Sequence, residues 1–235
     1  MKKLGLYVLV GLGLSACAGG MTTGGSLNNK GVKQNVVTQY PVETALLNIY
    51  TKPRSEKLYG DANSQFNTIE FIVVPKASTT FEGKRVQSAE MTVIAHNDDE
   101  TEKFATVHYF SVNPAIFYGF TNSLGEYSIA NQTSKMPKLA KVGTSSELIT
   151  ETVYADSSKR KMIDRYTQSW SLSQAGPQTA WFCIATSKSL LVADMEDSAT
   201  KECHKINADG DILASKLSYL PPAGSSEPSV TYFSR

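Results

Sequence analysis

The sequence predicts a β-rich α+β domain, a curved antiparallel sheet or open barrel with one N-terminal helix packed on it. From Phe66 onward, short segments alternate apolar and polar residues with the period of two that strands require. Polar turn sequences separate these segments, as in antiparallel hairpins. One stretch before them has helical spacing instead. A helix followed by about nine or ten strands leads to this fold class.

The first twenty residues have the layout of a secretory signal peptide. Lys2 and Lys3 precede an apolar run over 4–14, and small residues then lead into Cys17. The apolar run is too short to span a bilayer. The tetrapeptide 14–17, Leu-Ser-Ala-Cys, resembles the lipobox of bacterial lipoproteins.

That resemblance implies cleavage before Cys17, with a diacylglycerol on its sulfur and an N-acyl chain on its amine, and no other cofactor. Two lipid signals suffice for stable membrane anchoring. In such lipoproteins an aspartate after the cysteine favours the inner membrane, and Ala18 stands here. We therefore expect a protein anchored at the outer membrane, facing the periplasm or the cell surface.

The remaining chain divides into three parts. Residues 17–35 carry the lipidated cysteine and a Gly-, Ser- and Asn-rich tether that cannot bury enough apolar surface to fold. Residues 36–220 form a single β-rich periplasmic domain. Residues 221–235 read as a Pro/Gly/Ser-rich tail, although 230–233 have the composition to pair with a sheet edge.

The predicted helix lies within 36–59. Pro41 suits its first turn, Glu43 places negative charge near its N-terminus, and Pro53 ends it. An apolar stripe with spacing i, i+3, i+4 is formed by Leu46, Ile49 and Tyr50. We expect this helix to cap an open sheet edge or a barrel end, and binding of a partner is the alternative.

The predicted strands follow as a meander. The first ends at Pro75, and the last hairpin turns at 207–210 with its Asp-Gly pair. If Asp98 and Asp99 form the loop of an earlier hairpin, Val93 pairs with Phe104 and Met91 with Thr106. The other strands cover residues 147–155, 160–172, 180–186, 190–195, 201–206 and 212–220.

Residues 104–127 hold the densest group of aromatic side chains. One interpretation makes them core residues of two strands around a bend. The other makes them the lining of an apolar cavity, or a patch for a lipid-like or protein partner. The residues concerned are Phe104, Tyr109, Phe110, Phe117, Tyr118, Phe120 and Tyr127. Downstream, a local basic stripe is formed by Lys135, Lys138 and Lys141.

Lipidation of Cys17 leaves Cys183 and Cys203. An oxidising periplasm favours a disulfide between them, worth roughly 3 kcal/mol in the chain-entropy model. A meander with strand 190–195 between them would hold the cysteines too far apart. Either the sheet folds back, or 190–195 is not inserted, or the thiols are free. A metal site with His204 lacks paired cysteine spacing and a fourth ligand, so we predict no metal.

Composition and motifs bound the function. Removing 1–16 leaves 21 basic and 22 acidic residues, which gives no electrostatic basis for nucleic-acid binding. The sequence has no nucleophile elbow, phosphate loop or zinc-protease motif, so we expect no enzyme. Because neighbours on a strand face opposite ways, Cys203 and His204 cannot act as a catalytic pair.

Our leading hypothesis is a non-enzymatic lipoprotein whose domain docks a protein partner in envelope assembly or secretion. The alternative is a carrier of an acyl chain or similar apolar ligand. It rests on a layout that resembles the unclosed barrel of lipoprotein-handling outer-membrane factors, without their motifs. A third hypothesis is a hydrolase of envelope polymers. A carrier needs an internal cavity of roughly 300 Å³ or more, and a docking module needs an exposed patch or sheet edge.

Overall fold

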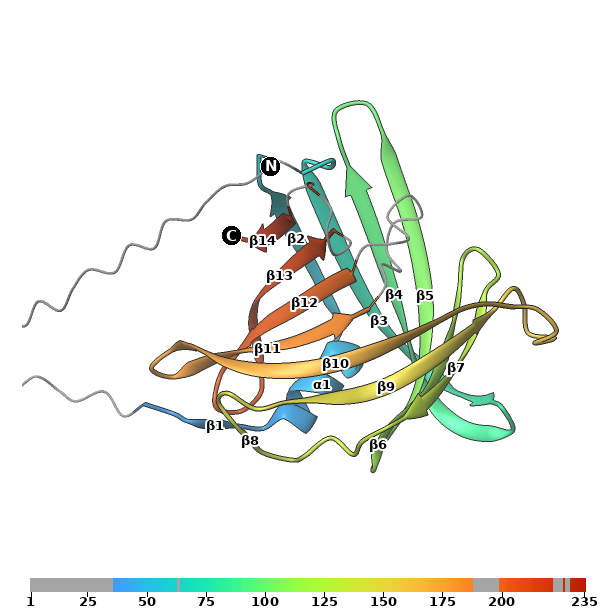
Figure 1. Cartoon of the computed structure of the whole chain (residues 1–235), viewed down its shortest axis with the longest axis horizontal. Coiled ribbons are helices and arrows are strands. Elements are labelled where there is room, and N and C mark those ends of the chain that lie inside the picture. The colour runs from blue at the N-terminus through green and yellow to red at the C-terminus, as the bar shows by residue number, and fades with distance from the viewer. Residues whose placement is uncertain (1–35, 63, 188–198, 222–225, 227–228) are drawn as a thin grey trace, which may run out of the picture. The chain divides into compact units, whose positions relative to one another are not determined.

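Twelve antiparallel strands close into a barrel in the order β10-β11-β12-β13-β14-β2-β3-β4-β5-β6-β7-β9 (Figure 1). The computed structural model describes residues 36–62, 64–187, 199–221, 226 and 229–235. The barrel strands are β2 Arg54–Gly60, β3 Thr68–Phe81, β4 Lys84–His96, β5 Thr101–Val112, β6 Ala115–Asn122, β7 Tyr127–Gln132, β9 Ser145–Tyr154, β10 Met162–Gly176, β11 Thr179–Thr186, β12 Ala199–Ile206, β13 Ile212–Leu220 and β14 Val230–Ser234. A separate two-stranded sheet pairs β1 Gln39–Tyr40 with β8 Ala140–Lys141.

Closure corrects one part of the predicted fold. The domain is β-rich with one helix among the described residues, as expected, but the barrel is closed and not an open barrel or curved sheet. β14, the last strand of the meander, pairs with β2, the first, and this joins its two ends. The predicted signal peptide, Cys17, the tether and strand 190–195 lie outside the described residues.

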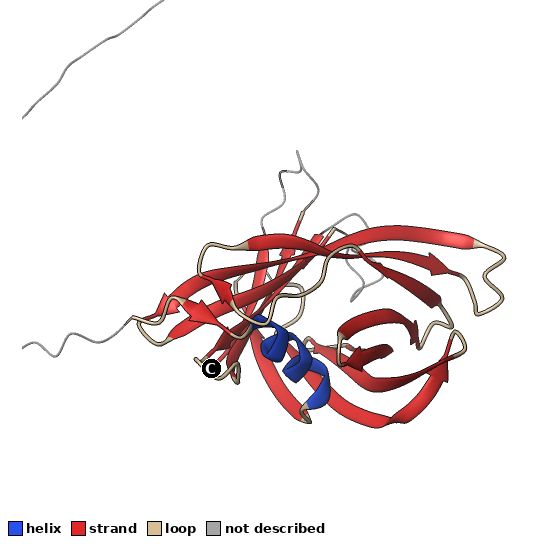
Figure 2. Ribbon diagram, turned by 90° about the horizontal axis from the view of Figure 1, so that it is seen from below, coloured by secondary structure: helices blue, strands red, loops and turns tan. Residues whose placement is uncertain are grey.

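The helix α1, Val42–Thr51, lies across one end of the barrel (Figure 2). Its apolar side chains join a core cluster contributed by strands from around the barrel. Its buried residues include the predicted stripe positions Leu46, Ile49 and Tyr50. Asn48 donates a hydrogen bond from Nδ2 to the carbonyl of Gly210 at 2.9 Å, which ties α1 to the β12–β13 turn. The expectation of a helix that caps a barrel end is confirmed.

A second core cluster fills the barrel beside α1. It consists of inward-facing residues of β2, β3, β4, β13 and β14 together with Phe66. Leu58, Ile69 and Leu217 are each at most 1% exposed. Alternation along each strand explains this packing, since every second side chain points into the barrel.

The hairpin of β4 and β5 has the predicted register. Val93 pairs with Phe104 and Met91 with Thr106 across β4 and β5. The expected stop at Pro75 is wrong, because β3 continues to Phe81. The pairing of β3 with β2 ends at Val73, so a proline beyond it removes no ladder hydrogen bond on that side.

The C-terminal assignment also needs correction. Residues 230–234 form β14 and pair with β13 on one side and β2 on the other. The prediction of a tail over 221–235 missed this strand, although pairing of 230–233 was recognised as possible. The barrel therefore uses the end of the chain to connect β13 to β2.

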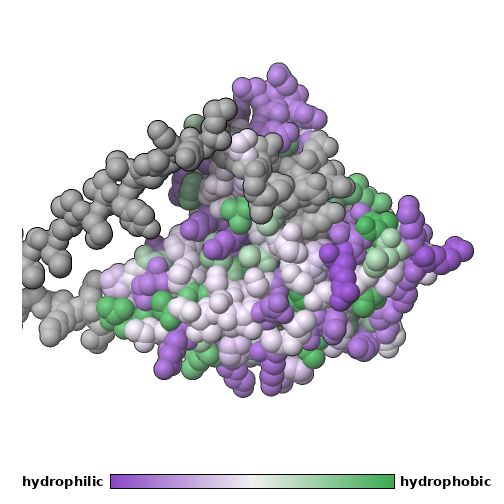
Figure 3. Space-filling model, viewed as in Figure 1, coloured by the Kyte–Doolittle hydropathy of each residue, from purple (hydrophilic) through white to green (hydrophobic). Residues whose placement is uncertain are grey.

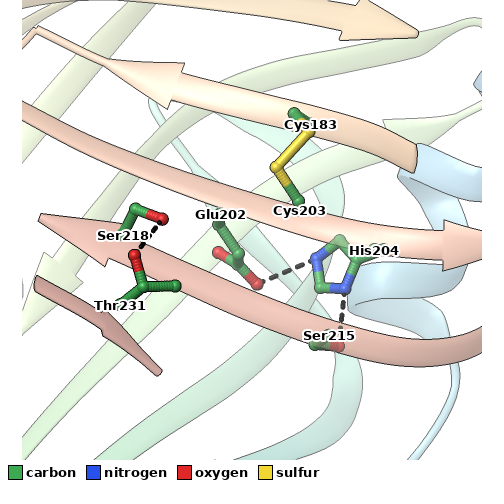
Figure 4. Close-up of a disulfide and its surroundings, with 7 residues drawn as sticks. All are labelled: Cys183, Glu202, Cys203, His204, Ser215, Ser218 and Thr231. Carbon is green, nitrogen blue, oxygen red and sulfur yellow. Dashed lines mark hydrogen bonds and ion pairs between the residues drawn. A yellow bond between two sulfur atoms is a disulfide. The ribbon is translucent and has the colours of Figure 1, made fainter. Parts of the chain in front are cut away.

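The two cysteines face each other directly. β11 pairs with β12, and Cys183 lies opposite Cys203 with the sulfur atoms at disulfide-bonding distance. No strand lies between β11 and β12, so of the three possibilities left open by the sequence, 190–195 is not inserted. The bond joins two neighbouring strands on the face opposite to the inward-facing His204 (Figure 4).

Replacing both cysteines tests the contribution of this bond. The Cys183→Ser/Cys203→Ser variant should lose about 3 kcal/mol of unfolding free energy, because the bond links residues separated by 20 positions. Urea denaturation of the full chain measures the loss. Reduced wild-type protein should have the same unfolding free energy as the variant. By mass spectrometry, the oxidised wild-type chain should be two hydrogens lighter than the reduced chain. Equal stability of oxidised wild type and variant would show that the bond is absent or without effect.

Candidate functional site: an outer groove and an internal cavity

The seven aromatic residues singled out in 104–127 do not form one patch. Phe110 and Phe117 pack on the ring of Tyr50 in the core beneath α1. Phe104 and Phe120 line a cavity inside the barrel. Tyr109 and Tyr127 both stack on Phe81, and Tyr118 lines a groove outside. The core interpretation and the lining interpretation therefore each apply to some of them.

The barrel is least regular where β6 meets β7. These strands share one register pair, Thr121 with Tyr127, although both make longer ladders with their other neighbours. We call residues 115–121 and 127–132 the β6–β7 seam. Hydrogen bonds to side chains of β7 take the place of the ladder: Phe120 N–H to Ser128 Oγ at 2.7 Å, Phe117 N–H to Gln132 Oε1 at 3.1 Å, and Gln132 Nε2–H to the Ala115 carbonyl at 3.2 Å.

Gly119 explains how the strands approach so closely at the seam. Its φ is +143°, which side chains rarely allow, and a Cβ there would lie 2.1 Å from the Ser128 carbonyl oxygen. The ring of Phe81 covers the same position, since its Cζ would lie 3.2 Å from that Cβ. Glycine is thus required where β6 contacts the backbone of β7.

The tip of the β3–β4 hairpin holds the two sides of the seam together. Phe81 stacks on Tyr109 of β5 and Tyr127 of β7, with ring centroids 4.1 and 5.1 Å apart. Glu82 pairs with Lys159 of the β9–β10 turn at 2.8 Å and accepts a hydrogen bond from Tyr127. Hydrogen bonding by Lys159 lowers the pKa of the Glu82 carboxyl. These contacts fix the strands on either side of the missing ladder.

A groove of about 490 Å³ follows the seam on the outside; we call it the outer groove. Among the described residues, its lining includes two lysines and no acidic residue, and Lys84 Nζ lies 4.8 Å from the centre of the Tyr118 ring. The lining residues are Lys84, Pro114, Ala115, Ile116, Phe117, Tyr118, Ala130, Asn131, Gln132, Thr133, Ser134 and Lys135. Lys135 belongs to the basic stripe seen in the sequence. The surface elsewhere mixes polar and apolar residues on the face in Figure 3.

A second hollow, the internal cavity, lies inside the barrel beside Tyr50 of α1. It measures about 90 Å³, well below the roughly 300 Å³ expected of a site for a carried lipid. Its lining is mixed, with aromatic rings, hydroxyl groups and one carboxylate. The residues are Tyr50, Met91, Phe104, Thr106, His108, Phe120, Asn122, Gln168, Ile184, Thr186, Thr200, Glu202 and Leu217.

The carboxylate of Glu202 belongs to a chain of buried polar contacts (Figure 4). Glu202 Oε1 lies 2.9 Å from His204 Nε2, an ion-pair distance without hydrogen-bond alignment. His204 Nδ1 lies 3.0 Å from Ser215 Oγ, and Ser215 donates to Glu56 at 2.6 Å. Arg54 lies 3.8 Å from Glu56. Burial raises the pKa of Glu202, but the charges of His204 and Arg54 outweigh it, so the net shift is downward.

Sequence reasoning missed the contact of His204 with Ser215. A serine, histidine and glutamate in a row suggest a catalytic triad, but Ser215 gives its hydroxyl proton to Glu56 and not to the imidazole. Neither Ser215 nor His204 lines the internal cavity, and they are 5% and 0% exposed. The arrangement is that of a charge network that joins β2, β12 and β13 inside the barrel.

A third buried carboxyl group lies behind the seam. Glu151 accepts hydrogen bonds from Ser128 at 2.9 Å and from the Tyr166 hydroxyl. Burial raises the pKa of Glu151, and these two hydrogen bonds oppose the shift. Because Ser128 also accepts from Phe120, one continuous chain of hydrogen bonds connects β6, β7, β9 and β10.

Among the described residues, no three histidine, cysteine, aspartate or glutamate side chains group as metal ligands would. In that same part of the chain, no helix has the length and apolar composition needed to cross a membrane.

His108 should make the fold sensitive to mild acid. Its surface faces the internal cavity, and burial lowers its pKa from 6.5 to about 4. Between these values the unfolded chain binds more protons, so stability is lost as pH falls from 6.5 toward 4, by up to about 3 kcal/mol. Urea denaturation at pH 7 and pH 4.5 should show that the free energy of unfolding falls less for His108→Phe than for wild type. For His96→Phe, at the rim of the barrel, it should fall as much as for wild type. An equal fall in all three proteins would show that His108 does not cause the acid sensitivity.

Comparison with known proteins gave no match, whether to family models, to curated proteins or to solved structures. The function therefore has to be inferred from the groove, the cavity and the chemistry of their linings.

Proposed function

We propose that this protein is a non-enzymatic lipoprotein, anchored at the outer membrane through Cys17, whose barrel docks an envelope protein in the outer groove. The observation that carries the docking proposal is the groove itself. It runs along a seam where the backbone ladder is interrupted, and it is lined by lysines without an acidic residue. In a closed barrel each strand is hydrogen-bonded to a neighbour on both sides. The seam interrupts this pairing, and the outer groove lies beside the interruption.

The shape and charge of the groove favour an extended acidic segment of a partner protein. The lining follows the extended strands β6 and β7, which suits an extended peptide more than a helix. Lys84 and Lys135 supply positive charge, and Tyr118 supplies an aromatic face beside Lys84. Opposite charges guide association and fix the orientation of the partner. Burial of the apolar lining contributes favourable free energy of binding.

The alternative of a lipid carrier receives less support. An acyl chain needs a continuous apolar cavity, and the internal cavity of about 90 Å³ holds a carboxylate and several hydroxyl groups. Three clusters of buried apolar side chains, one of them including α1, pack within the described barrel. We therefore do not propose lipid transport, and no cluster in the described residues favours polymer hydrolysis over docking.

Anchoring is tested by changing the acylated residue. Cys17→Ser removes the sulfur that would carry the diacylglycerol, so the chain should move from the membrane fraction to the soluble periplasmic fraction. Immunoblotting of the separated fractions measures the change, with Cys17→Ala as a second variant. Retention of both variants in the membrane fraction would overturn lipid anchoring while leaving docking open.

Docking is tested by a photo-crosslinking amino acid at Tyr118 in the full chain in cells. We expect a specific protein adduct, with the attachment site in an acidic segment by peptide mass spectrometry. Lys84→Glu/Lys135→Glu should lower the adduct yield by about fivefold, the size expected for lost attraction plus new repulsion at exposed lysines.

The matched control reverses two lysines elsewhere on the barrel. Lys201→Glu/Lys205→Glu on β12 changes net charge equally without touching the groove, and it should leave the yield unchanged. A crosslinker at Tyr59 of β2 controls for position. An unchanged yield with the groove variant, or adducts at Tyr118 with lipid alone, would contradict the proposal.

A further inference from the structure

The internal cavity is lined by several hydroxyl groups on largely buried residues. Tyr50, Thr106, Thr186 and Thr200 line it and are 8%, 9%, 8% and 7% exposed. Buried polar groups are normally paired, by protein or by a bound molecule. Four hydroxyl groups around one cavity therefore suit a polar occupant.

The charge of the lining determines the sign of that occupant. Among the described residues, Glu202 is the acidic residue in the lining, and no lysine or arginine lines the cavity with it. Glu202 Oε1 lies 2.9 Å from His204 Nε2, which is itself not part of the lining. An anion in the cavity would meet this carboxylate directly. A cation would meet the carboxylate and several hydroxyl oxygens.

The remaining lining is aromatic. Tyr50, Phe104 and Phe120 present rings to the cavity, and His108 adds a fourth ring that lies 5.2 Å from that of Tyr50. A carboxylate surrounded by aromatic rings is the arrangement that binds amines, through an ion pair and through the attraction of a cation to ring faces. Two or three oxygen acceptors also match the three N–H donors of a primary ammonium group.

We propose that the internal cavity binds a small primary ammonium ion, held by Glu202, the surrounding hydroxyl groups and the aromatic rings. This binding site is separate from the outer groove and does not rest on the docking function. A metal ion is a poorer fit, because no group of three metal-ligating side chains exists in the described part of the chain.

The volume limits the size and the affinity of the ligand. About 90 Å³ accommodates about three non-hydrogen atoms, if each takes the roughly 30 Å³ of a water molecule in the liquid. Ethylammonium has this size. The ceiling on binding free energy per atom then sets the dissociation constant at about 1 mM or weaker.

Met91 provides a probe inside the cavity wall. The full chain, in detergent micelles and labelled with 13C-methyl methionine, is titrated with ethylammonium chloride while methyl spectra are recorded. The Met91 signal should shift and saturate in the millimolar range, whereas that of Met136, buried in the core away from the cavity, should not move. Ethanol, a neutral molecule of the same size, and sodium chloride should each bind at least about tenfold more weakly.

Variants assign the interaction. Glu202→Gln should weaken ethylammonium binding by at least about tenfold. Glu102→Gln, which removes a carboxylate near the barrel rim but outside the cavity lining, should have no effect. If Glu202→Gln does not fold, Thr200→Val tests the same site by removing one hydroxyl group. No saturable shift in wild type, equal binding of ethanol, or unchanged binding in the variant that folds would overturn the proposal and leave a cavity that holds water.

Discussion

The interior volume of a twelve-strand barrel is the constraint on which the rest of this structure depends. Eight strands enclose a space that their own side chains fill, and the diameter grows with each added strand. Twelve strands therefore need additional material inside, and α1 provides it at one end. Tyr50, at the C-terminal part of α1, is buried and contacts Phe110 and Phe117. The internal cavity lies beside Tyr50 and is lined by it together with Phe104 and Phe120.

Filling the interior also brings charged groups out of water, and each needs a partner there. Glu202 contacts His204, Glu56 accepts from Ser215, and Glu151 accepts from Ser128 and Tyr166. Removing one member of such a pair leaves the other buried and uncompensated, which costs more than the pair contributes. The polar interior therefore fixes which strands lie next to each other as much as it stabilises them. In this barrel it connects β2 to β12 and β13, and β6 to β7, β9 and β10.

Local patterns in the sequence predicted the parts of the fold that are formed by neighbouring residues. Alternation and a polar turn gave the register of Val93 with Phe104, and helical spacing located α1. Closure was not predictable in this way, since the pairing of β14 with β2 depends on contacts between segments at opposite ends of the domain. Pro75 was misread as a stop because a single sequence does not show which strand has an unpaired side.

The candidate sites were harder to predict than the fold, for a related reason. The aromatic-rich stretch was identified correctly as a concentration of side chains, but its division among core, cavity and groove follows from the seam. The contact of His204 with Ser215 arises from a register that shifts by one residue at a bulge near Lys205 and Ile206. No residue pattern in the β12–β13 hairpin indicates that shift, so the buried network was invisible in the sequence.

The strand β6 lines both the outer groove and the internal cavity. Tyr118 of β6 lines the groove, and Phe120, two positions along, lines the cavity because Gly119 and the adjacent irregular pairing turn the strand between them. β6 is held to β7 by one register pair and three hydrogen bonds involving side chains, which is the smallest number of register pairs between neighbouring strands of the described barrel. A partner that displaces β6 through Tyr118 necessarily moves Phe120 and with it the wall of the cavity. The interrupted ladder thus connects the surface of the barrel to its interior, which a fully paired strand would separate.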